Sequence, residues 1–397
     1  MSLTFSRRME RVRPSAIRDL LAHGADPRLI SFGGGYPDQR LFPVAELRSV
    51  FDSVLSDATG SAALQYTTSE GLPALRAAIA DRLAAKGTPT AADDVLIVQG
   101  GQQGLDLVGK LMLDAGDTVI VEDPTFLGAL IALNPFEPQY ATVRIDDEGM
   151  DVEHLETVLA RHPETKMIYT VPDFHNPTGV TMSLARRTRL IELANQHDLL
   201  ILEDTPYREL RYDGEHLPTL RSLDTEGRVV HLGSYSKILA PGMRLGWVIA
   251  DPDVLARLTL LKLAADTQSS TLNMSAILAY TQQYDLDAHI ERLVDAYRIK
   301  RDLMLATIDD TFPAGIERTT PSGGLFTWLT FPEGFDSTAF MKDVALPEAR
   351  VAYVPGASFF AVDVKTNHAR INFSGLSEDD IVDGISRLGA LLTTHLK

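Results

Sequence analysis

The chain has 397 residues, of which 45% are hydrophobic and 23% are charged, so it is long enough for one large core and a second, smaller one. It carries 37 lysines and arginines against 54 aspartates and glutamates. The resulting net charge of −17 argues against a surface for nucleic acid or for an anionic membrane. With no cysteine, the chain has no disulfide, thiol nucleophile or thiolate metal site, and we predict no metal site.

The first residues, MSLTFSRRMERVRPS, lack the apolar stretch of a secretory signal. No apolar run approaches the roughly 18 residues that a membrane span needs. A chain without cysteine also fits a reducing compartment. We therefore expect a cytoplasmic protein without membrane or nucleic-acid partners. The segment up to about residue 45 is rich in Arg, Gly and Pro, and we expect it to pack on a smaller domain or on a partner subunit.

Between about residues 95 and 250, short apolar runs rich in β-branched residues alternate with helical patterns. The predicted strands cover residues 95–98, 118–122, 166–171, 199–204, 228–233 and 244–250. Their continuous apolarity indicates a mostly parallel sheet that is covered by helices on both faces. The helical patterns include residues 104–116 and 184–198, and Ser183 is the predicted N-cap of the second helix.

The pattern changes after about residue 285. A long amphipathic helix is predicted over residues 287–310, followed by strands at 325–330, 350–354 and 369–373 and by a final helix from about Ser377. This succession is typical of a smaller α+β domain. We therefore predict an N-terminal arm (1–45), a large domain (46–285) and a small C-terminal domain (286–397).

The segment after the strand at 228–233 is the most informative part of the sequence. It reads Ser234-Tyr235-Ser236-Lys237, and Arg244 follows seven residues after the lysine. A lysine amine forms a Schiff base with an aldehyde, and serine hydroxyls with an arginine bind phosphate, so the segment suits a phosphorylated aldehyde cofactor. A surface turn with a solvated lysine is the weaker interpretation, because the segment stands between two apolar strands.

Two further polar segments directly follow predicted strands, which is where ligand sites of open α/β sheets lie. Asn176 begins the sequence Asn-Pro-Thr-Gly, which by itself is only a tight turn. Asp204 ends the strand 199–204, and Tyr207 comes three residues later. A carboxylate at such a strand end either caps a helix or keeps a pyridine nitrogen protonated.

A glycine-rich segment, QGGQQG (residues 99–104), connects the first predicted strand to a helix. Glycines let the backbone approach a ligand closely, and free N–H groups at a helix start attract phosphate. The spacing is not the G-x-G-x-x-G of a dinucleotide site. The segment therefore predicts either a phosphate cradle or a packing turn.

Together and in this order, the glycine-rich segment, the Asn-Pro-x-Gly turn, the strand-end Asp and the Ser-x-Ser-Lys segment resemble the class I/II, fold-type I aminotransferases. The resemblance covers essentially the whole chain. LISFGGGYPD, LQYTTSEGLPALR, GGQQGLDLVGK and SYSKILAPGMRLGW are most similar to the branch that holds 2-aminoadipate and kynurenine aminotransferases.

The resemblance implies the PLP-transferase fold type I. This fold has a large domain with a mixed, mostly parallel seven-stranded sheet between helices and a smaller α+β domain. It also implies an enzyme with pyridoxal 5′-phosphate (PLP) as cofactor. Such an enzyme moves an amino group from an L-amino acid to a 2-oxo acid such as 2-oxoglutarate by a ping-pong mechanism. The donor would be 2-aminoadipate, glutamate, an aromatic or a branched-chain amino acid.

The resemblance gives the matching residues roles around the cofactor. Lys237 would form the Schiff base and carry the proton, and Asp204 would pair with the pyridine N–H. Asn176 and Tyr207 would bind the phenolic oxygen, and Phe126 would stack on the ring. The phosphate would be bound by Ser234, Ser236, Arg244 and the backbone of Gly101 and Gln102.

The resemblance also implies residues for the substrate and for a partner subunit. Arg370 would hold the α-carboxylate of the donor as a bidentate fork, with help from Gly35 and Asn176. Arg18 matches a position that can meet a side-chain carboxylate, although a solvated helix arginine fits the pattern equally well. Tyr66 would reach the phosphate of the neighbouring subunit, which implies a homodimer.

Two other functions stay open. Another PLP reaction, such as that of a C–S lyase or a synthase, would use the same cofactor site, because the reaction depends on which Cα bond is aligned with the ring. A transcription regulator with an aminotransferase-like domain would need an additional DNA-binding domain. The resemblance begins by about residue 15, which leaves no room for that domain, and the net charge also argues against DNA.

Overall fold

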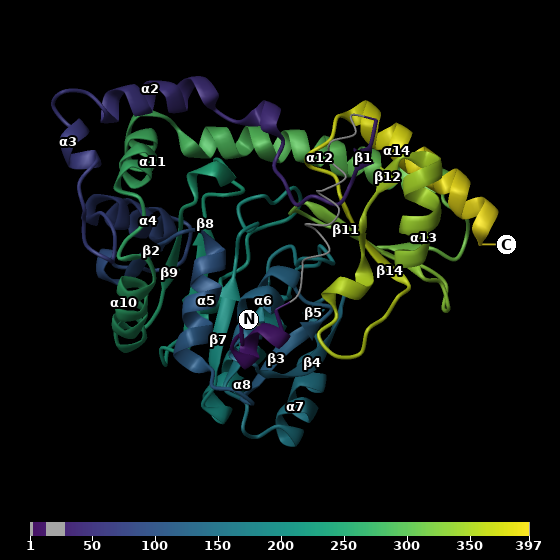
Figure 1. Cartoon of the computed structure of the whole chain (residues 1–397), viewed down its shortest axis with the longest axis horizontal. Coiled ribbons are helices and arrows are strands. Elements are labelled where there is room, and N and C mark those ends of the chain that lie inside the picture. The colour runs from purple at the N-terminus through teal and green to yellow at the C-terminus, as the bar shows by residue number, and fades with distance from the viewer. Residues whose placement is uncertain (1–2, 13–27, 397) are drawn as a thin grey trace.

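The structure is a computed structural model that describes residues 3–12 and 28–396. The predicted substrate contact of Arg18 lies outside these residues. Figure 1 shows a large part of the molecule built on a long sheet and a smaller part at the right built on short strands. The long helix α12 (Leu286–Thr311) runs along the top from one part to the other.

The large sheet is formed by β2 (Val95–Val98), β3 (Thr118–Asp123), β4 (Gln139–Asp146), β5 (Gly149–Met150), β6 (Met167–Thr170), β7 (Leu200–Asp204), β8 (Val229–Ser234) and β9 (Gly246–Ile249). Their order across the sheet is β2-β9-β8-β7-β6-β3-β4-β5. The pairs from β8 to β4 are parallel, whereas β9 is antiparallel to both of its neighbours. The predicted mixed, mostly parallel sheet is confirmed, and the two-residue β5 adds an eighth strand at its edge.

Both faces of this sheet are covered by helices, which explains the continuous apolar runs of its strands. On one face, Val121 and Leu232 belong to a core shared with α5 (Gly101–Met112), α6 (Leu127–Leu133) and α10 (Pro252–Asp266). On the other face, Ile168 and Ile201 belong to a core shared with α7 (Val152–Arg161) and α8 (Leu184–His197). Ser183 caps α8 as predicted, since its side chain accepts a hydrogen bond from the backbone N–H of Arg186.

Further helices of the large part lie before β2 and after β7 in the chain. These are α2 (Val44–Val54), α3 (Gly60–Ala63), α4 (Pro73–Ala85), and, later in the chain, α9 (Leu220–Leu223) and α11 (Thr271–Gln283). Val95, Ile97 and Ile249 of the sheet share a core with α4 and α11. Figure 1 shows α2, α3, α4 and α11 together at the end of the molecule opposite the smaller part.

The smaller part contains a four-stranded antiparallel sheet with the order β10-β11-β14-β13. Its elements are β10 (Glu317–Arg318), β11 (Phe326–Thr330), α13 (Ser337–Phe340), β13 (Val354–Pro355), β14 (His368–Asn372) and α14 (Glu378–His395). The predicted single strand over residues 350–354 is wrong. It is divided by buried Tyr353, whose hydroxyl donates to the carbonyl of Ser337 at 2.7 Å. The preceding strand β12 (Val351–Ala352) pairs instead with β1 (Ile30–Ser31).

This β1–β12 pair carries the segment around residues 33–36 into the space between the two parts. Nearer the N-terminus, the side chain of Arg11 donates a hydrogen bond to the carbonyl of Pro138 in the large part at 2.9 Å. The carboxyl ends of β3, β6, β7 and β8 lie at one edge of the large sheet because these strands are parallel. That of β2 lies at the same edge, because β9 is antiparallel to both β2 and β8. The polar segments that were singled out in the sequence therefore meet at this edge.

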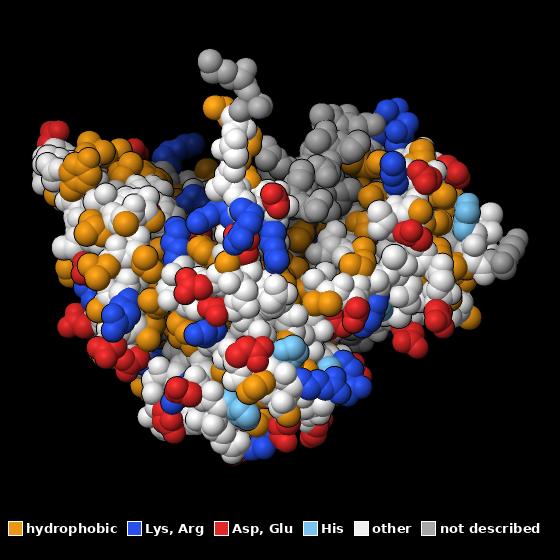
Figure 2. All heavy atoms as spheres, turned by 60° about the horizontal axis from the view of Figure 1, so that its bottom comes forward, with side chains coloured by type: hydrophobic (Ala, Val, Ile, Leu, Met, Phe, Trp, Pro, Cys, Tyr) orange, Lys and Arg blue, Asp and Glu red, His pale blue; other side chains and the backbone are white. Residues whose placement is uncertain are grey.

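The outer surface carries charges of both signs. Figure 2 shows acidic and basic side chains interspersed on one face of the molecule. None of the described helices combines the length and the apolarity that crossing a bilayer requires.

Candidate active site

A cleft opens where the strand ends meet the smaller part. It is lined by Gly35, Tyr36, Gly101, Gln102, Leu105, Phe126, Asn176, Asp204, Pro206, Tyr207, Ser234, Ser236, Lys237, Arg244, Phe326 and Arg370. Every predicted cofactor or substrate residue within the described part of the chain is among them, apart from Tyr66. Residues that are far apart in sequence thus form one site.

Lys237 lies in the turn that follows β8. This turn is held by local hydrogen bonds, including one from the backbone N–H of Ser236 to the hydroxyl of Ser234 at 3.0 Å. The Lys237 Nζ donates to the carbonyl oxygen of Gly35 at 2.7 Å. Burial, together with the positive charges of Arg370 and Arg244, lowers the pKa of Lys237 to about 8. The amine is therefore much more easily deprotonated than that of an ordinary lysine.

Asp204 is the last residue of β7, and its carboxylate is buried at the bottom of the cleft. Its Oδ2 accepts a hydrogen bond from the hydroxyl of Tyr169 in β6 at 3.0 Å. Burial raises the pKa of Asp204 to about 6, against the opposing effects of the Tyr169 hydrogen bond and of His231. Among the described residues, no Lys, Arg or His forms an ion pair with Asp204. The carboxylate is thus available to a cationic N–H group of a ligand.

Arg370 enters the cleft from β14 of the smaller part and is almost completely buried. Its Nη1 donates to Asn176 Oδ1 at 3.0 Å, and its Nη2 donates to the carbonyl of Gly33 at 2.8 Å. The guanidinium lies 4.2 Å from the ring centre of Phe326, while Nε has no partner among the described residues. Burial lowers the pKa of Arg370 to about 10. A buried cation with a free donor is a ready site for a carboxylate.

Asn176 connects this arginine to a buried tyrosine. Its Nδ2 donates to the hydroxyl of Tyr207 at 3.0 Å, while its Oδ1 accepts from Arg370. Burial raises the pKa of Tyr207 to about 12, although Arg370 and Asn176 act in the opposite direction. The Tyr207 hydroxyl therefore keeps its proton and is a hydrogen-bond donor at neutral pH.

The glycine-rich segment forms an open cradle at the start of α5. Gly100 has a φ of +77°, and a Cβ built on it would lie 2.9 Å from Arg244 Nη2. That nitrogen donates to the carbonyl of Gln99 at 3.1 Å. A Cβ built on Gly101, by contrast, would meet nothing within 4 Å. Gly101, Gln102 and Arg244 line the cleft here, and a helix start beside a guanidinium is an arrangement that favours phosphate.

The match to known families agrees with this geometry. The family model described as aminotransferase class I and II matches residues 34–388 of the chain. The chain belongs to this family. The aromatic-amino-acid aminotransferase 1 of Thermococcus litoralis is 39% identical to it over 99% of this chain and 95% of that protein.

Solved structures of aminotransferases have the same fold. The kynurenine aminotransferase of Pyrococcus horikoshii, in complex with PMP, matches with a TM-score of 0.94 and 39% identity over 99% of this chain and 98% of that one. The alpha-aminoadipate aminotransferase LysN of Thermus thermophilus, complexed with N-(5′-phosphopyridoxyl)-L-leucine, matches with a TM-score of 0.91 and 35% identity over the same shares. This aminotransferase thus has fold type I, its cofactor is PLP, and neither alternative function is favoured.

The residues of the cleft fit this cofactor. PLP carries an aldehyde, a phosphate and a ring nitrogen that can be protonated. The cleft offers an amine of lowered pKa in Lys237, an open cradle beside Arg244, and a buried carboxylate in Asp204. The net charge of the chain is −17, so the positive charges of Lys237 and Arg244 are a local feature of the cleft.

Tyr66 does not reach the cleft of its own chain. It is 80% exposed and lines a separate surface hollow with Leu64, Gln268 and Ser270. Four cleft residues were not predicted from the sequence, namely Tyr36, Leu105, Pro206 and Phe326. Pro206 and Tyr36 stand next to quoted motif residues and could have been included, whereas Leu105 and Phe326 look like ordinary core positions.

Proposed function

We propose that this aminotransferase takes its amino group from an acidic, aromatic or branched-chain L-amino acid and passes it to a 2-oxo acid such as 2-oxoglutarate. The names of its relatives, which include aromatic-amino-acid, kynurenine and alpha-aminoadipate aminotransferases, support this range. The observation that carries the proposal is the convergence of Lys237, Asp204 and Arg370 in one cleft. They are an amine, a carboxylate and a carboxylate-binding cation.

We propose that Lys237 and Asp204 perform the proton chemistry. Bound PLP supplies an electron sink and carries the amino group between the two half-reactions. Lys237 Nζ takes the proton from the donor Cα, which its lowered pKa supports because the amine must be unprotonated to do so. Asp204 holds a proton on the ring nitrogen, and this role is supported by the lack of an ion pair between its carboxylate and any Lys, Arg or His of the described residues.

We propose that the remaining cleft residues hold the cofactor in place. Tyr207 and Asn176 bind the phenolic oxygen, in keeping with their mutual hydrogen bond of 3.0 Å. Phe126 stacks on the ring from the start of α6. The phosphate is bound by Ser234, Ser236, Arg244 and the backbone N–H groups of Gly101 and Gln102.

We propose that Arg370 binds the α-carboxylate that all donors and acceptors share, with backbone at Gly35 lying alongside. Nη1 and Nη2 have protein partners, and the free Nε supports a further acceptor in the cleft. A planar guanidinium presents two parallel N–H groups to a carboxylate, which a lysine cannot do. Arg370 thus orients every substrate in the same way relative to Lys237.

A test of the proposed reaction is product analysis with and without an added 2-oxo acid. A transaminase converts only one equivalent of amino donor per cofactor when the acceptor is missing, and turns over when 2-oxoglutarate is supplied. Continued release of product without any 2-oxo acid would contradict the proposal and would indicate a lyase.

We further propose that the enzyme is a homodimer in which Tyr66 completes the phosphate site of the neighbouring subunit. The exposure of Tyr66 and its position outside its own cleft support this role. In a dimer of this kind, a mixture of Tyr66→Ala and Lys237→Ala subunits contains mixed dimers with one intact site. At limiting PLP, mixing the two variants should therefore restore activity, and a lack of any gain on mixing would overturn this role.

A further inference from the structure

A buried histidine and glutamate stand behind Asp204, and the proposed reaction gives them no role. His231 of β8 is paired in register with Glu203 of β7, and Asp204 is paired with Leu232. Because side chains alternate along a strand, Glu203 and His231 lie on the sheet face opposite to Asp204. Both are almost fully shielded from solvent, with exposures of 0% and 1%.

Glu203 is an ionised carboxylate in this position. Its Oε1 accepts from the backbone N–H of Leu220 at 2.7 Å, and its Oε2 accepts from that of Arg221 at 3.0 Å. Oε2 also lies 2.9 Å from His231 Nδ1. Burial alone would raise the pKa of Glu203, but His231 and the two backbone N–H groups lower it below its ordinary value. The carboxylate can only accept, so Nδ1 of His231 carries a proton.

The second ring nitrogen of His231 faces the hydroxyl of Thr205. Thr205 Oγ1 lies 2.8 Å from the carbonyl oxygen of Leu232 and 3.2 Å from His231 Nε2. A carbonyl oxygen has no proton, so the single hydroxyl proton of Thr205 is donated to Leu232. The contact with Nε2 then requires an N–H on the ring. A proton on both nitrogens makes the ring an imidazolium ion beside Glu203, and this is the state that the geometry favours.

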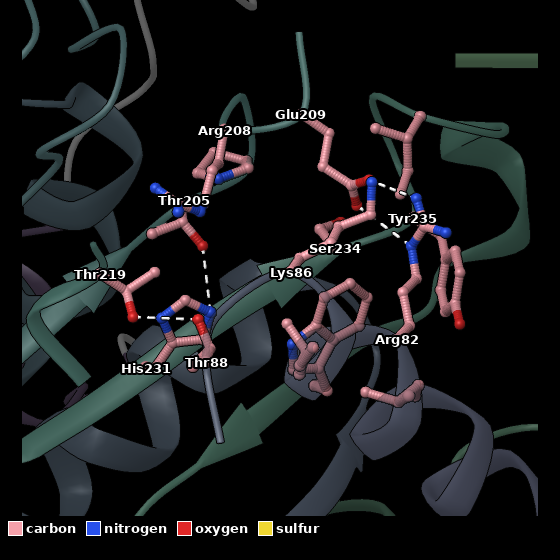
Figure 3. A pocket seen from close by; sticks show the side chains of 15 residues that line it. Arg82, Lys86, Thr88, Thr205, Arg208, Glu209, Thr219, His231, Ser234 and Tyr235 are labelled. Carbon is pink, nitrogen blue, oxygen red and sulfur yellow. Dashed lines mark hydrogen bonds and ion pairs between the residues drawn. The ribbon is translucent and has the colours of Figure 1, made fainter. Parts of the chain in front are cut away.

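Among the described residues, Glu203 is the acid whose carboxylate is in hydrogen-bond contact with His231. Figure 3 shows His231 and Thr205 joined by their hydrogen bond at the side of a small pocket. The only acid among the residues lining that pocket is Glu209, which forms ion pairs with Arg82 and with Lys86. Glu203 is therefore the counter-ion of His231.

We propose that His231 is a charged positioning residue for Asp204. Through Thr205 it fixes the backbone directly after Asp204, and its positive charge lies behind the sheet at the same strand end. This arrangement favours the ionised form of Asp204, which is the form that can pair with a protonated ring nitrogen. The proposal rests on the role of Asp204 in the proposed function. Burial raises the pKa of Asp204 and so favours the protonated acid, whereas the positive charge of His231 lowers this pKa.

The first test examines His231 itself in the protein without cofactor. Nitrogen-15 NMR of histidine-labelled protein at pH 7.5 should show an imidazolium signal with two N–H groups that is absent from His231→Gln. Thr205→Val removes the acceptor for Nε2 and should convert the signal to that of a neutral ring. A neutral His231 in the wild-type protein would overturn the proposal. This result does not depend on the function of Asp204.

The second test examines the effect on the cofactor. The absorbance of bound PLP changes with pH, and the midpoint of this change should lie about one pH unit higher in His231→Gln than in the wild type. The reason is that the variant has lost a nearby positive charge. Thr88→Val is the matched control, since Thr88 lines the same pocket and bonds only to Thr219 there, at 3.0 Å. It should leave the midpoint unchanged. Equal midpoints in wild type and His231→Gln, or equal shifts in both variants, would overturn the proposal.

The activity of Asp204→Asn, compared with the NMR result, separates this inference from the proposed function. If Asp204 had no role at the ring nitrogen, Asp204→Asn would be as active as the wild type, whatever the state of His231. If Asp204→Asn is inactive while His231 is neutral, the proposed function holds and the inference about His231 is wrong.

Discussion

The amine of Lys237 and the carboxylate of Asp204 are tuned in opposite ways by the same cleft. Burial disfavours the charged form of each group, so the pKa of Lys237 falls to about 8 while that of Asp204 rises to about 6. Lys237 therefore loses its proton at a lower pH than an ordinary lysine does. Asp204 becomes a strong partner for a cationic N–H group, because pairing relieves its unfavourable burial.

The role of Asp204 is tested by Asp204→Asn. The amide fills the same space and can still accept from Tyr169, so we expect the fold to be kept. Without the negative charge, the ring nitrogen loses its proton, and the amino-acid half-reaction should slow by at least about a hundredfold, as when one well-placed electrostatic group is removed. Single-turnover absorbance measures this rate, with PLP affinity as the control. A rate within about threefold of the wild type would exclude the role.

The lowered pKa of Lys237 predicts how capture of PLP depends on pH. Only the neutral amine attacks an aldehyde, so the rate at which the cofactor-free protein captures PLP should rise with pH. Its midpoint should lie near 8, not near the 10.5 of an ordinary lysine. Since Arg370 contributes to the shift, Arg370→Gln should move the midpoint upward. A midpoint near 10.5 in the wild-type protein would contradict the desolvation of Lys237.

At the residue scale, the sequence predicts the motif residues well and their supporting neighbours poorly. Lys237, Asp204, Asn176 and Arg370 stand in short, ordered segments at predicted strand ends, so both their presence and their meeting point could be inferred. Tyr169, which donates to Asp204, comes from the neighbouring strand β6. Its contact depends on strand register, which the pattern of a single strand does not contain.

At the scale of elements, six strands of the large sheet could be predicted because burial on both faces makes their sequences continuously apolar. β4 could not, because its residues alternate between exposed and buried positions near the sheet edge. The division of residues 350–354 between two sheets was also missed. Val351 and Val354 are both buried, and their apolarity does not reveal which partner strand each one has.

The glycine-rich element at the start of α5 gives a matched pair of substitutions. Gly100→Ala places a side chain at a φ of +77° and 2.9 Å from Arg244 Nη2, which costs about 1–2 kcal/mol of backbone strain and displaces the arginine. PLP affinity, measured by fluorescence titration, should fall about tenfold or more. Gly242→Ala, two residues before Arg244, meets nothing within 4 Å and should bind PLP like the wild type. Equal affinities in the two variants would contradict the cradle.

At the scale of the whole molecule, the site exists only because the two parts of the chain face each other. Arg370 of the smaller part donates to Asn176 of the larger part and to Gly33 of the N-terminal segment. Lys237 in turn donates to Gly35. Three distant stretches of sequence thus meet in the cleft.

This arrangement predicts a uniform effect of Arg370→Lys on all donors. Lysine keeps the charge but loses the planar pair of N–H groups, which is worth about 1.5–3 kcal/mol for a bond to a charged group, or roughly ten- to a hundredfold in kcat/KM. The measurement compares an acidic donor such as glutamate with an apolar donor such as leucine. Similar losses are expected, because both carry the same α-carboxylate. Clearly unequal losses would indicate that Arg370 contacts the side chain of the donor and not only its α-carboxylate.

The most direct test of the central claim is to locate the covalent attachment of the cofactor. The protein is loaded with PLP, reduced with borohydride, digested and analysed by mass spectrometry. We expect the phosphopyridoxyl mass on the peptide that contains Lys237, and its loss in Lys237→Ala. Lys110 is paired with Asp106 on α5, and Lys262 is buried against Asp266, so neither should react. Finding the mass on either of these two lysines, with Lys237 unmodified, would contradict the account.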